Sequence, residues 1–193
     1  MNKTKSLMIV GVGGQGSLLA SKLLGRLFVD EGYDVKVSEV HGMSQRGGSV
    51  VTYVRFGDSV ASPVVDRGGA DILVSFEPLE AARYQEFLKP GATVITNVHR
   101  VNPMPVITGA ATYPEAPLDA LSEAGLQVVA FDALALAEKA GSVKAVNIVL
   151  MGRLSLCFDI PPSAWEEALA ACVPPKFLEI NKRAFALGRE ANA

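Results

Sequence analysis

The sequence predicts an α/β fold: an open, mostly parallel sheet with helices on both faces and a helical C-terminal third. Short apolar runs of strand length alternate with segments in which apolar residues recur at helical spacing. Glycine and proline separate these segments. After residue 132 only helical patterns remain. Together these three observations favour alternating strands and helices, which typically build a parallel sheet.

The first forty residues predict one βαβ unit. Residues 7–10 form a continuous apolar run, typical of a central strand, and a glycine-rich turn follows them. Apolar residues then recur at helical spacing from Leu18 to Phe28. Residues 34–40 alternate valine with polar residues and predict a second strand. Such a unit is right-handed with parallel strands, so the predicted sheet is Rossmann-like.

The middle of the chain predicts the remaining strands, at residues 49–56, 71–76, 93–96 and 128–131. Pro78 can begin a helix whose apolar face runs over residues 79–88. Residues 118–124 predict a short helix. Between them, residues 97–117 predict a loop or an extended edge, because they contain four prolines: Pro103, Pro105, Pro114 and Pro117.

The C-terminal third predicts four helices. Asp132 is placed to cap a helix over residues 133–140. Further helices are expected over residues 144–156, from Pro161 through Cys172, and from Pro174 to the C-terminus. No repeat, low-complexity segment or linker divides the chain, so we expect a single domain over residues 1–193.

Composition excludes several classes of function. The 193 residues are 49% hydrophobic and 20% charged, as in soluble globular domains. A net charge of −2 gives no general attraction for nucleic acid or an anionic membrane. The apolar run before the first glycines is too short for a signal peptide, and residues 145–158 carry Asn147 and Arg153. We therefore expect a cytoplasmic protein with neither nucleic acid nor membrane as a partner.

Metal-ligating residues are few. The two cysteines, Cys157 and Cys172, are isolated, and buried thiols are their simplest interpretation. The chain has no ligand set for an iron–sulfur cluster or a structural zinc ion. Glu39, His41 and His99 do not have zinc-site spacing either. No metal is expected on this chain.

The first glycine-rich segment predicts an anion site. Gly11, Gly13 and Gly16 have the G-x-G-x-x-G spacing between a strand and a helix, with Gly14 and Gln15 inside it. Glycine lets a ligand approach the backbone closely, and helix N-terminal N–H groups attract negative charge. A dinucleotide site also needs an acid about 20 residues further on, and Glu39 lies roughly there. The alternative is that these glycines only form a tight turn.

A second segment, residues 41–48 (HGMSQRGG), follows Glu39 directly. If the two segments are adjacent, His41, Gln45 and Arg46 project where an adenosine would otherwise lie. Arg46, flanked by Gly47 and Gly48, can bind a carboxylate or phosphate through two hydrogen bonds. The alternatives are a surface arginine and a loop histidine bonded to backbone. His41 and Arg46 are the candidate catalytic residues, with the other residues named in these two segments as candidate ligand contacts.

Three further polar residues lie in structured segments. Glu77 ends a predicted strand at the edge where ligands bind in open α/β sheets, although such a residue more often caps a helix. Asn147 and Asn181 lie in otherwise apolar helices. They either form hydrogen bonds across a helix contact or subunit interface, or occupy ordinary exposed positions.

The chain resembles the gamma-type domain of 2-oxoacid:ferredoxin oxidoreductases, and most of all the small (beta) subunit of the indolepyruvate type. The resemblance rests on four stretches spread over nearly the whole chain, of which the second is the most specific: residues 11–16 (GVGGQG), 38–50 (SEVHGMSQRGGSV), 144–153 (KAVNIVLMGR) and 181–188 (NKRAFALG).

The resemblance implies oxidative decarboxylation of a 2-oxo acid, an aryl pyruvate in the indolepyruvate type, to acyl-CoA, CO₂ and reduced ferredoxin. Thiamine diphosphate and iron–sulfur clusters would belong to a larger partner subunit, because this chain lacks both the cluster cysteines and the Gly-Asp-Gly signature. Coenzyme A would be a co-substrate of a heteromer with two copies of each subunit.

Two alternatives remain open at this point. The glycine motif and Glu39 also fit a stand-alone NAD(P)- or flavin-dependent oxidoreductase, although no tyrosine–lysine pair or catalytic acid stands out. A purely structural or regulatory subunit is the other.

Overall fold

The computed structural model describes residues 4–39 and 48–192. In these residues the chain forms a six-stranded sheet of order β2-β3-β1-β4-β5-β6. The strands are β1 (Lys5–Val12), β2 (Asp34–Glu39), β3 (Ser49–Gly57), β4 (Ala70–Ser75), β5 (Leu88–Asn97) and β6 (Gln127–Phe131).

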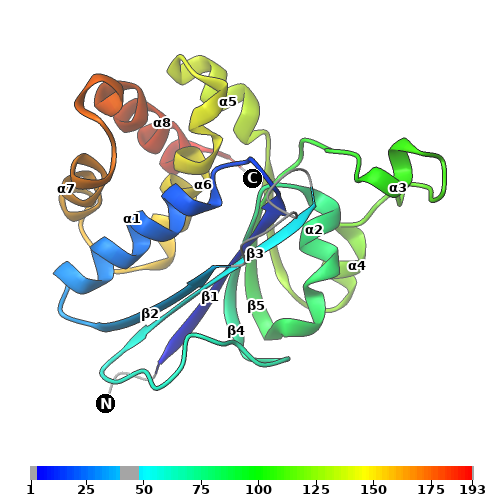
Figure 1. Ribbon diagram of the computed structural model, residues 1–193, viewed down its shortest axis with the longest axis horizontal. Coiled ribbons are helices and arrows are strands. Elements are labelled where there is room, and N and C mark those ends of the chain that lie inside the picture. The colour runs from blue at the N-terminus through cyan, green and yellow to red at the C-terminus, as the bar shows by residue number, and fades with distance from the viewer. Residues whose placement is uncertain (1–3, 40–47, 193) are drawn as a thin grey trace.

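The strand pairing in the sheet differs from that of a simple βαβ unit at one strand, β3. β1, β4, β5 and β6 are parallel neighbours, whereas β3 is antiparallel to both β1 and β2. β1 and β2 therefore run in the same direction, as predicted, but β3 lies between them (Figure 1). The sheet remains mostly parallel, and the predicted α/β class is confirmed.

Helices cover both faces of the sheet, also as predicted (Figure 1). One face carries α1 (Ser17–Asp30), α5 (Ala133–Ala140), α6 (Val146–Leu154), α7 (Pro162–Cys172) and α8 (Leu178–Glu190). The other face carries the short helices α2 (Pro78–Arg83) and α4 (Asp119–Glu123).

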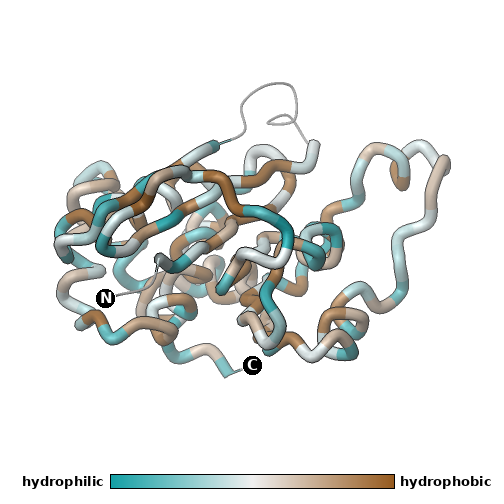
Figure 2. The backbone as a smooth tube through the Cα atoms, turned by 90° about the horizontal axis from the view of Figure 1, so that it is seen from below, coloured by the Kyte–Doolittle hydropathy of each residue, from teal (hydrophilic) through white to brown (hydrophobic). Residues whose placement is uncertain are grey.

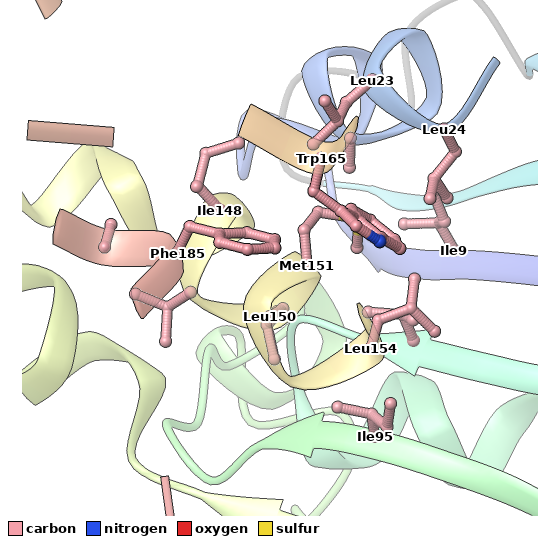
Figure 3. Packing of buried hydrophobic residues seen from close by; sticks show 14 of the residues in the cluster. Ile9, Leu23, Leu24, Ile95, Ile148, Leu150, Met151, Leu154, Trp165 and Phe185 are labelled. Atoms are coloured by element: carbon pink, nitrogen blue, oxygen red, sulfur yellow. The ribbon is translucent and has the colours of Figure 1, made fainter. Parts of the chain in front are cut away.

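Two hydrophobic cores follow from the alternation along β1. Leu7 and Ile9 belong to the larger cluster beneath α1 and the C-terminal helices, whereas Met8 and Val10 belong to the smaller cluster on the α2 side. Trp165 of α7 and Phe185 of α8 lie in the larger cluster, with ring centroids 5.7 Å apart (Figure 3). The C-terminal helices therefore share the core of the sheet.

Helices α6 and α8 cross at two glycines. A Cβ atom on Gly152 would overlap the carbonyl oxygen of Phe185, and one on Gly188 would overlap that of Val149. The backbones of the two helices are therefore in direct contact, which only glycine permits at these positions.

Two predicted elements need correction, and one residue of the apolar pattern is exposed. The helix expected over residues 79–88 ends at Arg83, and a 3₁₀ turn (Gln85–Phe87) leads into β5 at Leu88, which pairs with Ala70. Residues 97–117 are irregular as predicted, except that Asn97 ends β5 and α3 (Met104–Ile107) forms one turn. Leu18 belongs to the apolar pattern of α1 but is exposed.

Candidate functional site at the glycine-rich turn

The glycine-rich turn joins β1 to α1 at the carboxyl end of the parallel strands (Figure 1). Gly14 and Gly16 have φ angles of 99° and 92°, a conformation that side chains disfavour. Gly16 is the N-cap residue of α1 and brings no side chain to cap it. The first N–H groups of α1 therefore lack a side-chain acceptor from the cap position, and this is the part of the turn suited to an anion.

The two glycine-rich segments meet at Gly48. The Gly13 N–H donates to the Gly48 carbonyl at 2.8 Å, and the register of β1 and β3 pairs Val12 with Ser49. The end of the second segment therefore lies beside the first. His41, Gln45, Arg46 and Gly47 lie outside the described residues, so their positions remain predictions.

Gln15 shapes the turn from within. Its Oε1 accepts the Val12 N–H at 2.7 Å, and its Nε2 donates to the Phe76 carbonyl at 3.4 Å. A Cβ atom on Gly11 would lie 2.6 Å from the same Oε1. The Gln15 amide therefore fills the space where a side chain on Gly11 would lie, and it links β1 to Phe76, the residue that follows β4. The motif spacing alone does not reveal this role.

Asn147 holds the other end of the turn. Its Nδ2 donates to the Gly16 carbonyl at 3.1 Å, and a Cβ atom on Gly16 would lie 2.8 Å from that nitrogen. The predicted hydrogen bond across a helix contact is thus confirmed for Asn147. Asn181 instead donates to the Phe177 carbonyl at 2.8 Å, one turn earlier in the chain.

Two hollows flank the turn. One, of about 310 Å³, is lined by Gly13, Gly14, Ser17 and Thr52 among others. The other, of about 500 Å³, lies between the turn, the end of β5 and the start of α6, and is lined by His99 and Lys144. Because the Lys144 ammonium group borders the larger hollow, this hollow also suits a negatively charged group.

Glu39 does not lie where a dinucleotide site requires it. The usual dinucleotide order places the second strand directly beside the first, whereas β3 separates β2 from β1 here. The Ser21 hydroxyl of α1 donates to Glu39 Oε1. Glu39 therefore contacts α1 from β2, which is separated from β1 by β3. This position weakens the dinucleotide interpretation.

Glu77 caps α2, as the simpler of its two interpretations predicts. The carboxylate is buried, and its Oε2 accepts the Glu80 N–H at 2.9 Å. Its Oε1 accepts the Tyr113 hydroxyl and, at 3.4 Å, the Val101 N–H. Burial, and then the bond to Glu77, raise the pKa of Tyr113. The sequence gives no sign that Glu77 also holds residues 101 and 113.

Glu80 anchors the start of β3. It is buried, it accepts a hydrogen bond from the Ser49 hydroxyl, and Arg83 lies 3.5 Å from its carboxylate. Burial raises the pKa of Glu80. Since Ser49 follows Gly48, this carboxylate fixes the chain next to the Gly13–Gly48 contact. Sequence reasoning missed this residue.

Across the described residues, no group of three or more His, Cys, Asp or Glu side chains could hold a metal ion. Cys157 and Cys172 are half-buried, and burial raises the pKa of both thiols. In the same part of the chain, no helix is long and apolar enough to cross a membrane.

Comparison with known proteins decides the family. Residues 6–191 match the model of the pyruvate ferredoxin/flavodoxin oxidoreductase family. The chain belongs to this family. A family member in Thermococcus kodakarensis, indolepyruvate oxidoreductase subunit IorB, is 45% identical over 98% of this chain and 96% of its own length. The predicted identity as a subunit of a 2-oxoacid:ferredoxin oxidoreductase is thereby confirmed, in preference to a stand-alone nicotinamide or flavin enzyme.

Solved structures show the same family fold. The gamma subunit of the keto/oxoacid ferredoxin oxidoreductase of Geobacter sulfurreducens has a TM-score of 0.72 at 23% identity, covering 96% of each chain. The 2-oxoglutarate:ferredoxin oxidoreductase of Magnetococcus marinus also has a TM-score of 0.72, at 19% identity. That match covers 98% of this chain but only 31% of the other. The fold therefore occurs both as a separate subunit and as one part of a longer chain.

Proposed function

We propose that this chain is the small, non-thiamine subunit of a heteromeric indolepyruvate:ferredoxin oxidoreductase. The complex converts an aryl pyruvate, coenzyme A and two oxidised ferredoxins to acyl-CoA, CO₂, two reduced ferredoxins and a proton. The observation that carries the proposal is the 45% identity to an IorB subunit over nearly the full length of both chains.

The reactive groups belong to a larger partner. The described residues offer no cluster ligands, and the two cysteines stand apart in the Ser155–Cys157 turn and at the end of α7. The sequence has no Gly-Asp-Gly segment of the thiamine diphosphate type. We therefore assign thiamine diphosphate and the iron–sulfur clusters to that larger subunit, in a cytoplasmic complex with two copies of each chain. Thiamine diphosphate supplies the decarboxylation chemistry there, and ferredoxin receives the electrons.

The glycine-rich turn is the part of this chain that faces the reaction. The N-terminus of α1, the Gly13–Gly48 contact and the larger hollow support a role in shaping or covering the active site at the partner interface. The same features favour an anionic group, of coenzyme A or of the substrate, as what this edge contacts. His41, Gln45, Arg46 and Gly47 are assigned to this edge by sequence.

Co-expression with a larger, thiamine- and cluster-binding subunit from the same organism tests the proposal. The two chains should purify as one brown, thiamine-containing complex that reduces ferredoxin when indolepyruvate and coenzyme A are both supplied. Phenylpyruvate, pyruvate and 2-oxoglutarate, assayed in parallel, report the substrate class. A chain that stays monomeric beside the larger subunit, or a complex that prefers 2-oxoglutarate to aryl pyruvates, contradicts it.

A further inference from the structure

A segment to which the proposed function assigns no role projects from the sheet. Residues 98–117, here called the arm, leave β5 at the site edge and return to α4 (Figure 1). The arm stands away from the rest of the chain in a second view as well (Figure 2). None of its residues belongs to either hydrophobic cluster among the described residues. Its conformation is therefore not explained by packing of the fold.

The surface of the arm is unlike an ordinary solvent-exposed surface. Residues 101–114 contain no Asp, Glu, Lys, Arg or His, although 20% of the chain is charged. Met104 and Ile107, both in the single turn of α3, are each 65% exposed. Large apolar side chains at the tip of a neutral projection are typical of a protein contact surface.

The arm is ordered at its tip. Backbone bonds close the tip on itself, with Thr108 N–H donating to Met104 at 2.9 Å and Ala111 N–H donating to Pro105 at 3.0 Å. Met104 and Ile107 are thus presented on a closed turn.

The root of the arm is fastened to the body by a buried carboxylate. Glu77 accepts hydrogen bonds from Tyr113 and Val101 on the two sides of the root. Arg100 stacks on the Tyr113 ring at 4.9 Å and donates to the Glu115 carbonyl at 2.8 Å. Burying a carboxylate is costly unless its bonds are made, so this clamp holds the arm in one position. A surface that is ordered before binding loses less entropy when it binds.

The root of the arm also borders the candidate site. His99 belongs to the arm and lines the larger hollow together with Gly14 and Lys144. The arm therefore begins beside the glycine-rich turn, and a partner that contacts its root lies next to the candidate site.

We propose that the arm docks, through Met104 and Ile107, into an apolar groove of the larger subunit. The inference rests on the proposed function, because that function supplies the partner. A second copy of this chain would not explain why the arm starts at the edge where the partner's reactants must lie.

The test compares charged substitutions on the arm with matched ones elsewhere. The double variant Met104→Asp/Ile107→Asp is mixed with the purified larger subunit, and the dissociation constant is measured by interferometry. The control is Val29→Asp/Leu156→Asp, which changes two apolar residues of similar exposure, 57% and 48%, outside the arm. We expect binding to weaken by roughly tenfold or more in the arm variant alone. Both variants should keep the wild-type melting temperature.

Tyr113→Phe provides a milder test, because it removes only the two hydrogen bonds of the Tyr113 hydroxyl, one to Glu77 and one from the Leu79 N–H, and leaves the apolar tip intact. It should weaken binding less than the double variant and leave the fold unchanged. Equal binding of the wild-type chain and the arm variant to the larger subunit overturns the proposal. So does a wild-type homodimer that the arm variant alone dissociates, since the occupant is then a second copy. Absence of any wild-type complex instead contradicts the proposed function itself.

Discussion

Gln15 and Asn147 show how single amides hold the candidate site. Gln15 satisfies the Val12 N–H inside the turn, and Asn147 satisfies the Gly16 carbonyl at its end. Both residues stand out in the sequence, but the partners of an amide depend on which backbone groups remain unpaired in the folded turn. The sequence therefore identifies the residues and leaves their partners open. Glu80, buried beside Ser49, shows no signal in the sequence at all.

Arg46 is the residue on which the proposed role depends most directly. Replacing it with alanine should leave the complex assembled and lower kcat/KM by roughly tenfold to a hundredfold, because one charge-assisted contact to an anion is lost. Arg46→Lys keeps the positive charge but loses the paired N–H donors, so its kcat/KM should lie between those of the wild type and of Arg46→Ala. The measurement is steady-state ferredoxin reduction by the purified complex. If Arg46→Ala leaves turnover unchanged, the second glycine-rich segment has only a structural role.

Glu80 predicts a pH dependence of stability. Burial raises its pKa above the ordinary value of 4.5, so the folded chain binds this proton more tightly than the unfolded chain. The resulting contribution to stability is full below about pH 4.5 and is lost as the pH rises through the raised pKa. Glu80→Gln keeps an acceptor for Ser49 but does not titrate.

The free energy of unfolding of the wild type, minus that of Glu80→Gln, should therefore fall as the pH rises from 4.5 toward neutrality. Urea titrations at several pH values measure it. Glu86→Gln, at an exposed carboxylate 3.4 Å from Arg67, is the control for loss of a surface charge. Parallel profiles of wild type and Glu80→Gln would show that burial does not govern this carboxylate.

At the scale of the elements, the sequence predicts where the strands lie better than it predicts their order in the sheet. Each strand predicted from the sequence overlaps a strand of the structure: residues 7–10 lie in β1, and the predicted strand 71–76 matches β4 except for its last residue. The order of the strands is not encoded locally: β3 pairs antiparallel with both β1 and β2 and so lies between them, and no local sequence pattern predicts that position. The helix after Pro78 was predicted too long, since the apolar face includes Leu88, whose side chain faces the core from a strand instead.

The crossing of α6 and α8 gives a prediction at the element scale. Gly188→Ala places a methyl group where the Val149 carbonyl already lies, so the two helices must separate. We expect a loss of about 1–3 kcal/mol or more in unfolding free energy. Gly25→Ala is the matched control, because its new Cβ would meet Val37 at an ordinary 3.6 Å. That substitution, inside α1, should stabilise the chain by up to about 1 kcal/mol. Denaturant titrations of both variants give the comparison, and equal effects would exclude a backbone contact at the crossing.

At the scale of the whole molecule, the C-terminal third is part of the sheet's core. Trp165 and Phe185 belong to the same cluster as Ile9 of β1 and Leu24 of α1 (Figure 3). A separate helical domain would instead have a core of its own. The predicted single domain over residues 1–193 therefore implies that the sheet and the C-terminal helices unfold together.

Trp165 makes this cooperativity measurable, because it is the only tryptophan of the chain and is fully buried in α7. Its fluorescence reports the C-terminal helices, whereas far-UV circular dichroism reports the whole chain. In urea the two signals should give one transition with the same midpoint, as a two-state domain requires. Gly188→Ala should shift both midpoints equally, since loosening α8 loosens the shared core. If fluorescence instead changes at lower urea while most of the dichroism remains, the helices are an independent unit, and the single-domain prediction is wrong.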